Sequence, residues 1–250
     1  MNSNWQPDLV SIIMPCYNAN DTILASIESV LNQTYSNWEL LIVDDCSTDA
    51  SLATLKELQD PRIHVLALAE NSGVAVARNR AIQMAAGQYI AFLDSDDSWM
   101  PDKLSKQLAF MRQNKAAISY TEYYIVQRQR KKLVKVPATL IYKQLLKNTI
   151  MGCLTVIIDR HIVGQVRMPQ MRTRQDTATW LSILKQGYTA HGLQEPLAQY
   201  VITNDSLSGK KTKMLRQNWH LYRDVEGLAF LPAAYVFVCY ATNAVKKRIF

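Results

Sequence analysis

Three carboxylates, Asp94, Asp96 and Asp97, stand directly after a short apolar run. The run, residues 89–93, is too short for a helix and rich in β-forming residues, so it predicts a strand buried on both faces. In an extended segment Asp94 and Asp96 share one face, and their charges repel unless a cation lies between them. Oxygen ligands without His or Cys suit Mg²⁺ or Mn²⁺, which commonly joins one or two carboxylates to the phosphates of a substrate.

A polar turn that caps the next helix is the alternative explanation for these acids. That helix could begin at Met100 or Pro101, with Asp97 or Ser98 just before it. Such a turn accounts for one acid but poorly for three, so a metal site is the preferred interpretation.

Apolar runs and helical patterns alternate over residues 8–113. Asp21 or Thr22 is placed to cap the first helix, and Gly87 to end the third. This alternation indicates an α/β fold with a mostly parallel sheet between two helical layers. Strands are expected at residues 9–14, 38–43, 63–67 and 89–93, and helices from residue 23, over 50–58 and over 74–86.

Polar side chains follow three of these strands, at residues 15–18, 44–45 and 94–97. In open α/β sheets, ligands bind beyond the carboxyl ends of the strands, so these residues are expected to line one crevice. The sequence has no Gly-x-Gly-x-x-Gly or Walker A motif. Neither dinucleotide binding nor P-loop phosphate transfer is therefore supported.

The motifs at residues 10–18, 42–49, 71–79 and 94–97 resemble those of the family 2 glycosyltransferases, which have the GT-A fold. The resemblance spans roughly residues 8 to 205. It implies a nucleotide-sugar site in which Asp45, the second acid of its pair, accepts the imide hydrogen of uracil. Taken singly, each matched residue could instead form a turn, cap a helix or lie on a solvated face. The implied donor-site residues are Pro15, Tyr17 and Asp45 at the base, Arg78 near the phosphates, Asp94 near the ribose, Asp96 on the metal, and Asn18 and Ser95 beside them.

Gln175-Asp176 stands where this family carries an acidic pair, usually Glu-Asp, at the start of a helix. By resemblance, Asp176 is the catalytic base. The alternative is that Asp176 only caps a helix over residues 177–186, and both roles can hold together because a helix start fixes a carboxylate's direction. Glutamine in place of glutamate removes a neighbouring charge and leaves the aspartate.

Residues 200–211 resemble the loop that closes over the donor diphosphate, recognisable at Ser206, Ser208 and Lys211. The arginine that often follows the tyrosine is absent, and Val201 stands there, which puts diphosphate contact by this loop in question. The basic run 128–132 predicts an exposed hairpin turn.

The 250 residues can bury one sizeable core. We expect a catalytic domain over residues 1–209, with a donor half (8–113) and an acceptor half (114–209), and a helical tail over 210–250. Four separated cysteines without a Cys-x-x-Cys pair argue against zinc and disulfides. The polar first eight residues carry no signal segment, so a cytoplasmic location is expected.

Charge is unevenly distributed along the chain. Residues 1–127 carry 8 basic and 15 acidic side chains, whereas residues 128–250 carry 20 and 6. No nucleic-acid-binding motif accompanies the basic half, so phosphate-bearing substrates and an anionic membrane surface are the expected partners. The uncharged segment 228–245 is interrupted by Pro232, so it is expected to lie on the inner face of the cytoplasmic membrane rather than to span it. The alternative is that its aromatic residues pack against the catalytic domain or a second subunit.

Together these features predict an inverting, metal-dependent transferase that moves a hexose from a UDP-sugar to a saccharide on a lipid diphosphate. Trp219 with Tyr222 and Arg223, followed by an apolar tail, is similar to the ends of bacterial transferases that build O-antigen or capsule units. This resemblance implies a setting in bacterial surface polysaccharide synthesis, of O-antigen, lipopolysaccharide or capsule. Two alternatives stay open: a sugar nucleotidyltransferase, and a non-catalytic nucleotide-sugar-binding subunit of an assembly complex.

Overall fold

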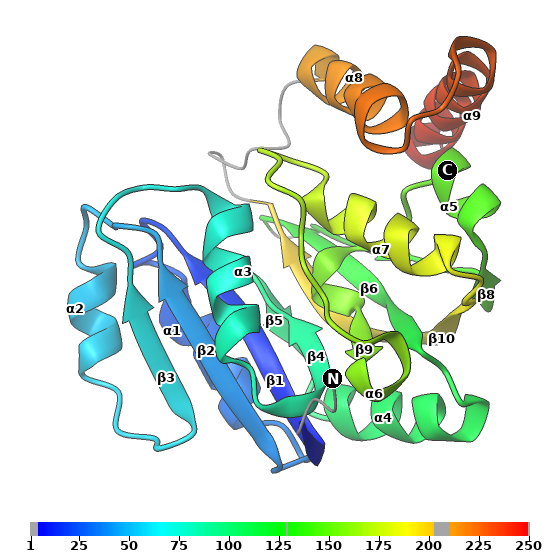
Figure 1. The fold of residues 1–250 in the computed structure, drawn as a ribbon. Helices are drawn as coiled ribbons and strands as arrows, with labels where there is room; N and C mark the ends of the chain where they lie inside the picture. The colour runs from blue at the N-terminus through cyan, green and yellow to red at the C-terminus, as the bar shows by residue number, and fades with distance from the viewer. Residues whose placement is uncertain (1–4, 129, 203–210, 250) are drawn as a thin grey trace.

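The computed structural model describes residues 5–128, 130–202 and 211–249 (Figure 1). One sheet of ten strands forms its centre, in the order β3-β2-β1-β4-β9-β6-β10-β5, with β7 added to β6 and β8 to β10. The strands are β1 (Gln6–Cys16), β2 (Trp38–Asp44), β3 (Ile63–Ala67), β4 (Gly87–Phe92), β5 (Ser98–Trp99), β6 (Ile118–Gln127), β7 (Arg130–Val134), β8 (Thr139–Leu140), β9 (Ile157–Asp159) and β10 (Ala190–Val201).

Helices cover both faces of this sheet. A 3₁₀ turn, η1 (Cys153–Thr155), precedes β9, and a π-helical turn, η3 (Leu221–Val225), follows α8. The helices are α1 (Ile23–Leu31), α2 (Ser51–Lys56), α3 (Val74–Met84), α4 (Lys103–Asn114), α5 (Tyr142–Lys147), α6 (Arg160–Val163), α7 (Gln175–Lys185), α8 (Lys211–His220) and α9 (Phe230–Ile249).

The sheet is mixed but mostly parallel in its first half. Strands β3, β2, β1 and β4 run parallel to one another, as do β6 and β10. Strand β9 lies between these two groups and is antiparallel to both β4 and β6. The predicted α/β class and parallel first half are therefore confirmed.

Alternate residues of β1 pack into two separate hydrophobic cores, one on each face of the sheet. Val10, Ile12 and Met14 pack with the apolar faces of α1 and α4, whereas Ile13 packs with α3 and α7 on the opposite face. A strand buried on both faces reads as a continuous apolar run, which is what the sequence showed. The three-layer arrangement follows from this double burial.

Local signals at helix ends were less reliable than the strand signals. Gly87 does not end α3, which stops at Met84, but opens β4. A Cβ at Gly87 would lie 2.4 Å from the carbonyl oxygen of Leu9, so close strand contact explains the glycine. Thr22 occupies the N-cap position of α1, but its hydroxyl donates to the carbonyl oxygen of Ala19 and does not cap the helix. Helix α4 begins at Lys103, after Met100 and Pro101.

The C-terminal helices join the main core rather than forming a separate layer of their own. Leu221, Tyr222, Ala233 and Val236 belong to the same buried cluster as Trp180 of α7. The Tyr222 hydroxyl donates a hydrogen bond to the carbonyl oxygen of Leu146, at 2.8 Å. The expected boundary at residues 209–210 and the diphosphate loop with Ser206 and Ser208 lie outside the described residues.

The outward and inward faces of α9 differ. Tyr240 is buried and Phe237 packs against the core, as the packing alternative predicted, whereas Phe230 and Tyr235 are exposed. Within the described ranges, no helix has both the length and the apolar character needed to cross a bilayer. The tail is thus docked on the body by one face, with apolar side chains left on the other.

Candidate active site

The polar segments expected at the strand ends do meet at one edge of the sheet. Parallel pairing sets Cys16 of β1 beside Asp44 of β2, and Ile13 of β1 beside Phe92 of β4. The segments that follow, 15–18, 44–45 and 94–97, therefore lie side by side at the carboxyl ends of these strands. Figure 1 shows this edge at the top of the sheet, on the side where the loop before α7 also ends.

Asp45 holds the loop that precedes α3. Its two carboxylate oxygens accept hydrogen bonds from the backbone N–H groups of Ser72, at 2.7 Å, and Gly73, at 2.8 Å. Gly73 has φ +90°, a conformation that favours glycine. Each carboxylate oxygen retains a second lone pair, so Asp45 can still accept a hydrogen bond from the N–H group of a nucleobase. Asp45 is thus hydrogen-bonded to the loop that carries the motif at residues 71–79.

Tyr17 and Asn18 follow β1 and are both exposed, Tyr17 with 49% of its surface. Pro15 is buried within the strand. Asn18 has φ 49°, and its side-chain oxygen accepts the backbone N–H of Thr48 at 2.7 Å. Asn18 therefore ties the loop after β1 to the loop after β2, while Tyr17 is free to present its ring.

Arg78 is not a solvated helix residue. It is only 4% exposed and forms an ion pair with Asp94, joining α3 to the end of β4. Its Nε is buried and has no hydrogen-bond partner among the described residues. A buried guanidinium with an unpaired N–H can still donate to an anionic ligand at this edge.

The acids after β4 are crowded. Burial, and then the charge of Asp94, raises the pKa of Asp96 to about 6. Burial raises the pKa of Asp97 well above its usual value, and Asp94 and Asp96 add to that effect. Asp97 accepts the backbone N–H of Val201 at 3.0 Å, so it fixes the end of β10 rather than capping a helix.

The donor set of this edge fits a hard divalent ion that is shared with a substrate. Asp94 forms an ion pair with Arg78, and Asp97 accepts a hydrogen bond from the backbone N–H of Val201. Of the three acids after β4, Asp96 is the one that makes neither of these contacts. In the described ranges there is no group of three or more His, Cys, Asp or Glu side chains arranged to hold an ion. The chain would therefore supply one carboxylate or two, and phosphate and water oxygens the other ligands, as Mg²⁺ sites commonly have.

Asp176 lies in the first turn of α7, whose N-cap is Arg174 and not Asp176. Arg174 has φ +66°, and its guanidinium donates to the Tyr240 hydroxyl of α9 at 3.0 Å. Burial raises the pKa of the Cys153 thiol; Arg78 opposes that rise, and Asp94, Asp176 and Asp97 add to it. Asp176 therefore lies within electrostatic reach of the same buried group as the strand-end acids and Arg78.

Gln175, the residue in place of the family's glutamate, is 5% exposed. Its side-chain oxygen is buried without a partner among the described residues. Cys153, by contrast, was not anticipated, because a lone cysteine in the sequence carries no signal for this position. The remaining predicted residues, Asp94, Ser95 and Asp96, are half-buried at the same edge.

A mixed sheet covered by helices on both faces, with acids at the carboxyl ends of its parallel strands, is the arrangement that the resemblance to family 2 glycosyltransferases implies. The model of Glycosyl transferase family 2 matches residues 11–170. The chain belongs to glycosyltransferase family 2.

Relatives of known name cover the full chain. TuaG of Bacillus subtilis (strain 168), whose name assigns it to teichuronic acid biosynthesis, is 52% identical over 99% of this chain and 100% of its own. WfgD of Escherichia coli, a UDP-Glc:α-D-GlcNAc-diphosphoundecaprenol β-1,3-glucosyltransferase, is 41% identical over 97% of this chain and 96% of its own.

Solved structures with the same fold are more distant in sequence. Staphylococcus aureus TarS 1–349 in complex with UDP-GlcNAc has a TM-score of 0.70 at 17% identity, covering 93% of this chain and 71% of that one. The mannosyltransferase PcManGT of Pyrobaculum calidifontis, in complex with GDP-Man and Mn²⁺, has a TM-score of 0.67 at 20% identity, covering 93% and 68%. At these identities the likeness establishes the fold, which confirms the GT-A expectation.

Proposed function

We propose that this glycosyltransferase moves a hexose from a UDP-sugar to a saccharide carried on a lipid diphosphate, in the synthesis of a bacterial surface polysaccharide. The observation that carries the proposal is that Arg78, Asp94, Asp97 and Asp176 all act electrostatically on one buried thiol, Cys153, at the edge of the sheet where Arg78 and Asp94 form an ion pair. The names of TuaG and WfgD support the setting, the donor and the acceptor class.

In this proposal Asp176 is the base of a single displacement. Its carboxylate takes the proton of an acceptor hydroxyl while that oxygen bonds to the anomeric carbon. The bond from the anomeric carbon to the donor phosphate breaks, UDP leaves, and the configuration inverts. Asp176 is fixed for this role because the N-cap residue of its helix, Arg174, is hydrogen-bonded to Tyr240.

The other residues bind the donor. Tyr17 and Asp45 hold the base, and Arg78 donates towards the diphosphate while Asp94 orients Arg78 and reaches the ribose. Pro15, Asn18 and Ser95 shape this pocket. Asp96 would hold Mg²⁺ or Mn²⁺, which when bound neutralises the charge of the departing diphosphate.

The two alternatives find no support here. A sugar nucleotidyltransferase needs a Gly-rich basic loop after its first strand, whereas here β1 ends at Cys16 and Asn18 bonds to the loop after β2 at Thr48. A non-catalytic subunit would have no need of a base, whereas Asp176 stays at the helix start.

A donor panel tests the proposed function. With Mn²⁺ present, the purified protein should release UDP slowly from one UDP-hexose, and much faster when an α-GlcNAc-diphosphate lipid is added. Coupled measurement of free nucleotide diphosphate gives both rates. Turnover with a GDP-sugar in place of every UDP-sugar, or no effect of the lipid diphosphate, would contradict the donor or the acceptor assignment respectively.

We also propose that the exposed face of α9 docks on the inner face of the cytoplasmic membrane. Leu231, Tyr235 and Val238 recur at helical spacing and are 78%, 59% and 59% exposed. Lys147 of α5 lies at the rim of this apolar stripe, its Nζ 3.2 Å from the Tyr235 hydroxyl. An apolar helical face with lysine beside it suits an anionic bilayer surface, where each lysine contributes about 1 kcal/mol.

Changing two residues of this stripe to serine, L231S with V238S, should weaken sedimentation with anionic vesicles several-fold, because the buried apolar area is lost. The residues are exposed, so melting temperature should change little. The matched control is L24S with L31S, a pair of exposed leucines at the same spacing on α1. Equal sedimentation of both double variants would contradict docking through α9. Deleting the whole tail is a poorer test, because Tyr222 and Val236 belong to the main core.

A further inference from the structure

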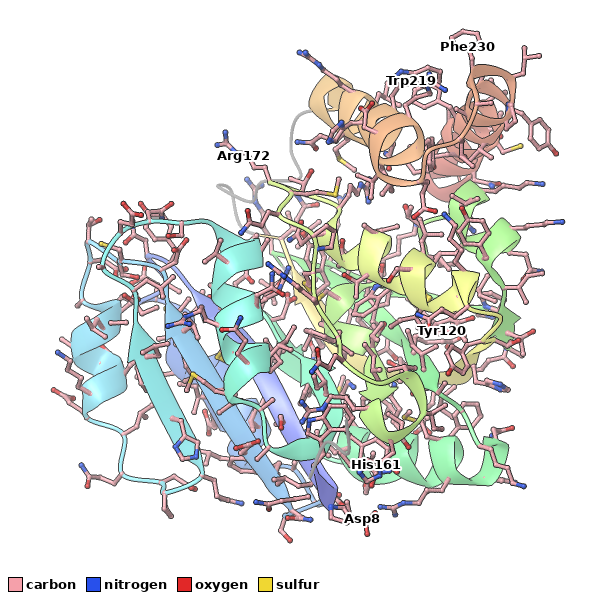
Figure 2. The ribbon with its side chains drawn as sticks, viewed as in Figure 1. Asp8, Tyr120, His161, Arg172, Trp219 and Phe230 are labelled. Atoms are coloured by element: carbon pink, nitrogen blue, oxygen red, sulfur yellow. The ribbon has the colours of Figure 1, made fainter. Side chains whose placement is uncertain are left out.

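A cavity of about 250 Å³ lies between the loop that leads into α7 and the end of α8. Its lining comes from two segments far apart in sequence: Gln170, Met171, Arg172, Thr173, Gln217 and His220. Figure 2 shows Arg172 at the tip of the loop before α7, on the side of the body that faces α8. The predicted base, Asp176, follows three residues after Thr173, so the cavity borders the proposed site of reaction.

The chemistry of the lining is that of an anion site. Arg172 and His220 bring a guanidinium and an imidazole, Gln170 and Gln217 bring amides, and the lining contains no carboxylate. The guanidinium fork of arginine matches phosphate oxygens, which it can bind through two parallel N–H donors.

Two polar groups of this cavity are available for hydrogen bonds to a ligand. The Thr173 hydroxyl is buried and has no hydrogen-bond partner among the described residues, which is costly unless a ligand or water supplies one. His220 Nδ1 is paired with Asp224 Oδ2 at 2.5 Å, which leaves Nε2 as the ring nitrogen that a ligand can use.

Contacts with α9 hold the two lining segments of the cavity in place. Arg174, next to Thr173, is bound to Tyr240 of α9, and Trp219, next to His220, packs edge-on against Phe230 and Phe237 of the same helix. Helix α9 therefore fixes both segments that line the cavity. A site formed in advance in this way loses less entropy when a ligand binds.

We infer that this cavity binds the diphosphate of the acceptor, with Arg172 as its principal ligand. The inference rests on the proposed function, since only a lipid-diphosphate acceptor brings a second diphosphate beside Asp176. It assigns the acceptor's phosphates to the junction of the α7 loop and α8, on the far side of the reacting hydroxyl from the donor. The chain would then discriminate acceptors by their phosphate as well as by their sugar.

The experiment compares two acceptors that differ only in phosphate: a short-chain alkyl α-GlcNAc diphosphate and the corresponding phosphate-free alkyl α-GlcNAc. With R172A, KM for the diphosphate acceptor should rise about tenfold or more, because a charge-assisted arginine–phosphate contact is lost. KM for the UDP-sugar and for the phosphate-free acceptor should stay unchanged. R172K should recover part of the loss, and R167A, an exposed arginine outside the cavity lining, should behave as the unchanged protein.

Binding without turnover separates this inference from the proposed function. Calorimetric titration of the alkyl α-GlcNAc diphosphate into protein saturated with UDP should show about tenfold weaker binding in R172A. If the unchanged protein binds this probe in an Arg172-dependent way yet transfers no sugar to it, the proposed acceptor is wrong and the diphosphate site stands. If transfer occurs but R172A affects both acceptors equally, or raises KM for the donor instead, the cavity is not the acceptor's diphosphate site.

Discussion

Replacing Asp176 with asparagine is expected to lower kcat by roughly 10²-fold or more, since a positioned general base contributes on that order. Asparagine keeps the size of the side chain in the first turn of α7 but cannot take a proton. The fold should persist, with a small loss from removing a negative charge near a helix N-terminus, about 0.3–1 kcal/mol. KM for the UDP-sugar should change little, because Asp176 faces the acceptor in this proposal. Steady-state kinetics with each substrate varied in turn give the separation.

Glu195 supplies the matched control for this variant. Glu195 is a surface acid paired with Lys106, so E195Q should keep kcat near that of the unchanged protein. Full transfer activity in D176N would move the base elsewhere. Glu122, a largely buried acid of β6, would then be the first residue to test.

The parts of the fold that followed from sequence are those set by local pattern. Continuous apolar runs predicted β1, β2 and β4, because strands buried on both faces need apolar side chains at every position. The antiparallel insertion of β9 between β4 and β6 could not be foreseen, since pairing between residues so distant in sequence leaves no local signature. Gly87 was misassigned for the same reason: the strand that excludes a side chain there belongs to another part of the chain.

The candidate site also has features that the local sequence pattern predicted and features that depend on packing. Motif spacing indicated that the acids at 44–45 and 94–97 would share one edge, because parallel strands bring their carboxyl ends together. It could not show that Arg78 is buried against Asp94, or that Arg174 is held by Tyr240. Those contacts depend on how α3 and α9 pack, and packing is a property of the assembled layers. The sequence therefore predicted which acids lie at one edge of the sheet, and the structure shows which contacts hold Arg78 and Arg174 in place.

Replacing Asp96 with asparagine is expected to abolish the metal-dependent gain in UDP affinity and with it nearly all turnover. Asp96 is the strand-end carboxylate without a tie to Arg78 or Val201, so it is the one left to hold an ion. Calorimetric titration of UDP, with and without Mn²⁺, measures the effect directly. UDP affinity without metal should be similar in D96N and the unchanged protein, because Tyr17, Asp45 and Arg78 are untouched.

Melting temperatures distinguish metal binding by Asp96 from a purely structural role of this side chain. Asp96 is partly buried beside Asp94 and Asp97, so removing its charge relieves repulsion, and the metal-free melting temperature of D96N should not fall. D94N, by contrast, leaves the buried Arg78 without its ion pair and should melt at a lower temperature. D102N is the control, because Asp102 is an exposed acid paired with Lys106 on α4, away from the strand ends. If D96N still binds UDP more tightly with Mn²⁺, Asp96 does not hold the metal, and the ion's place passes to Asp94.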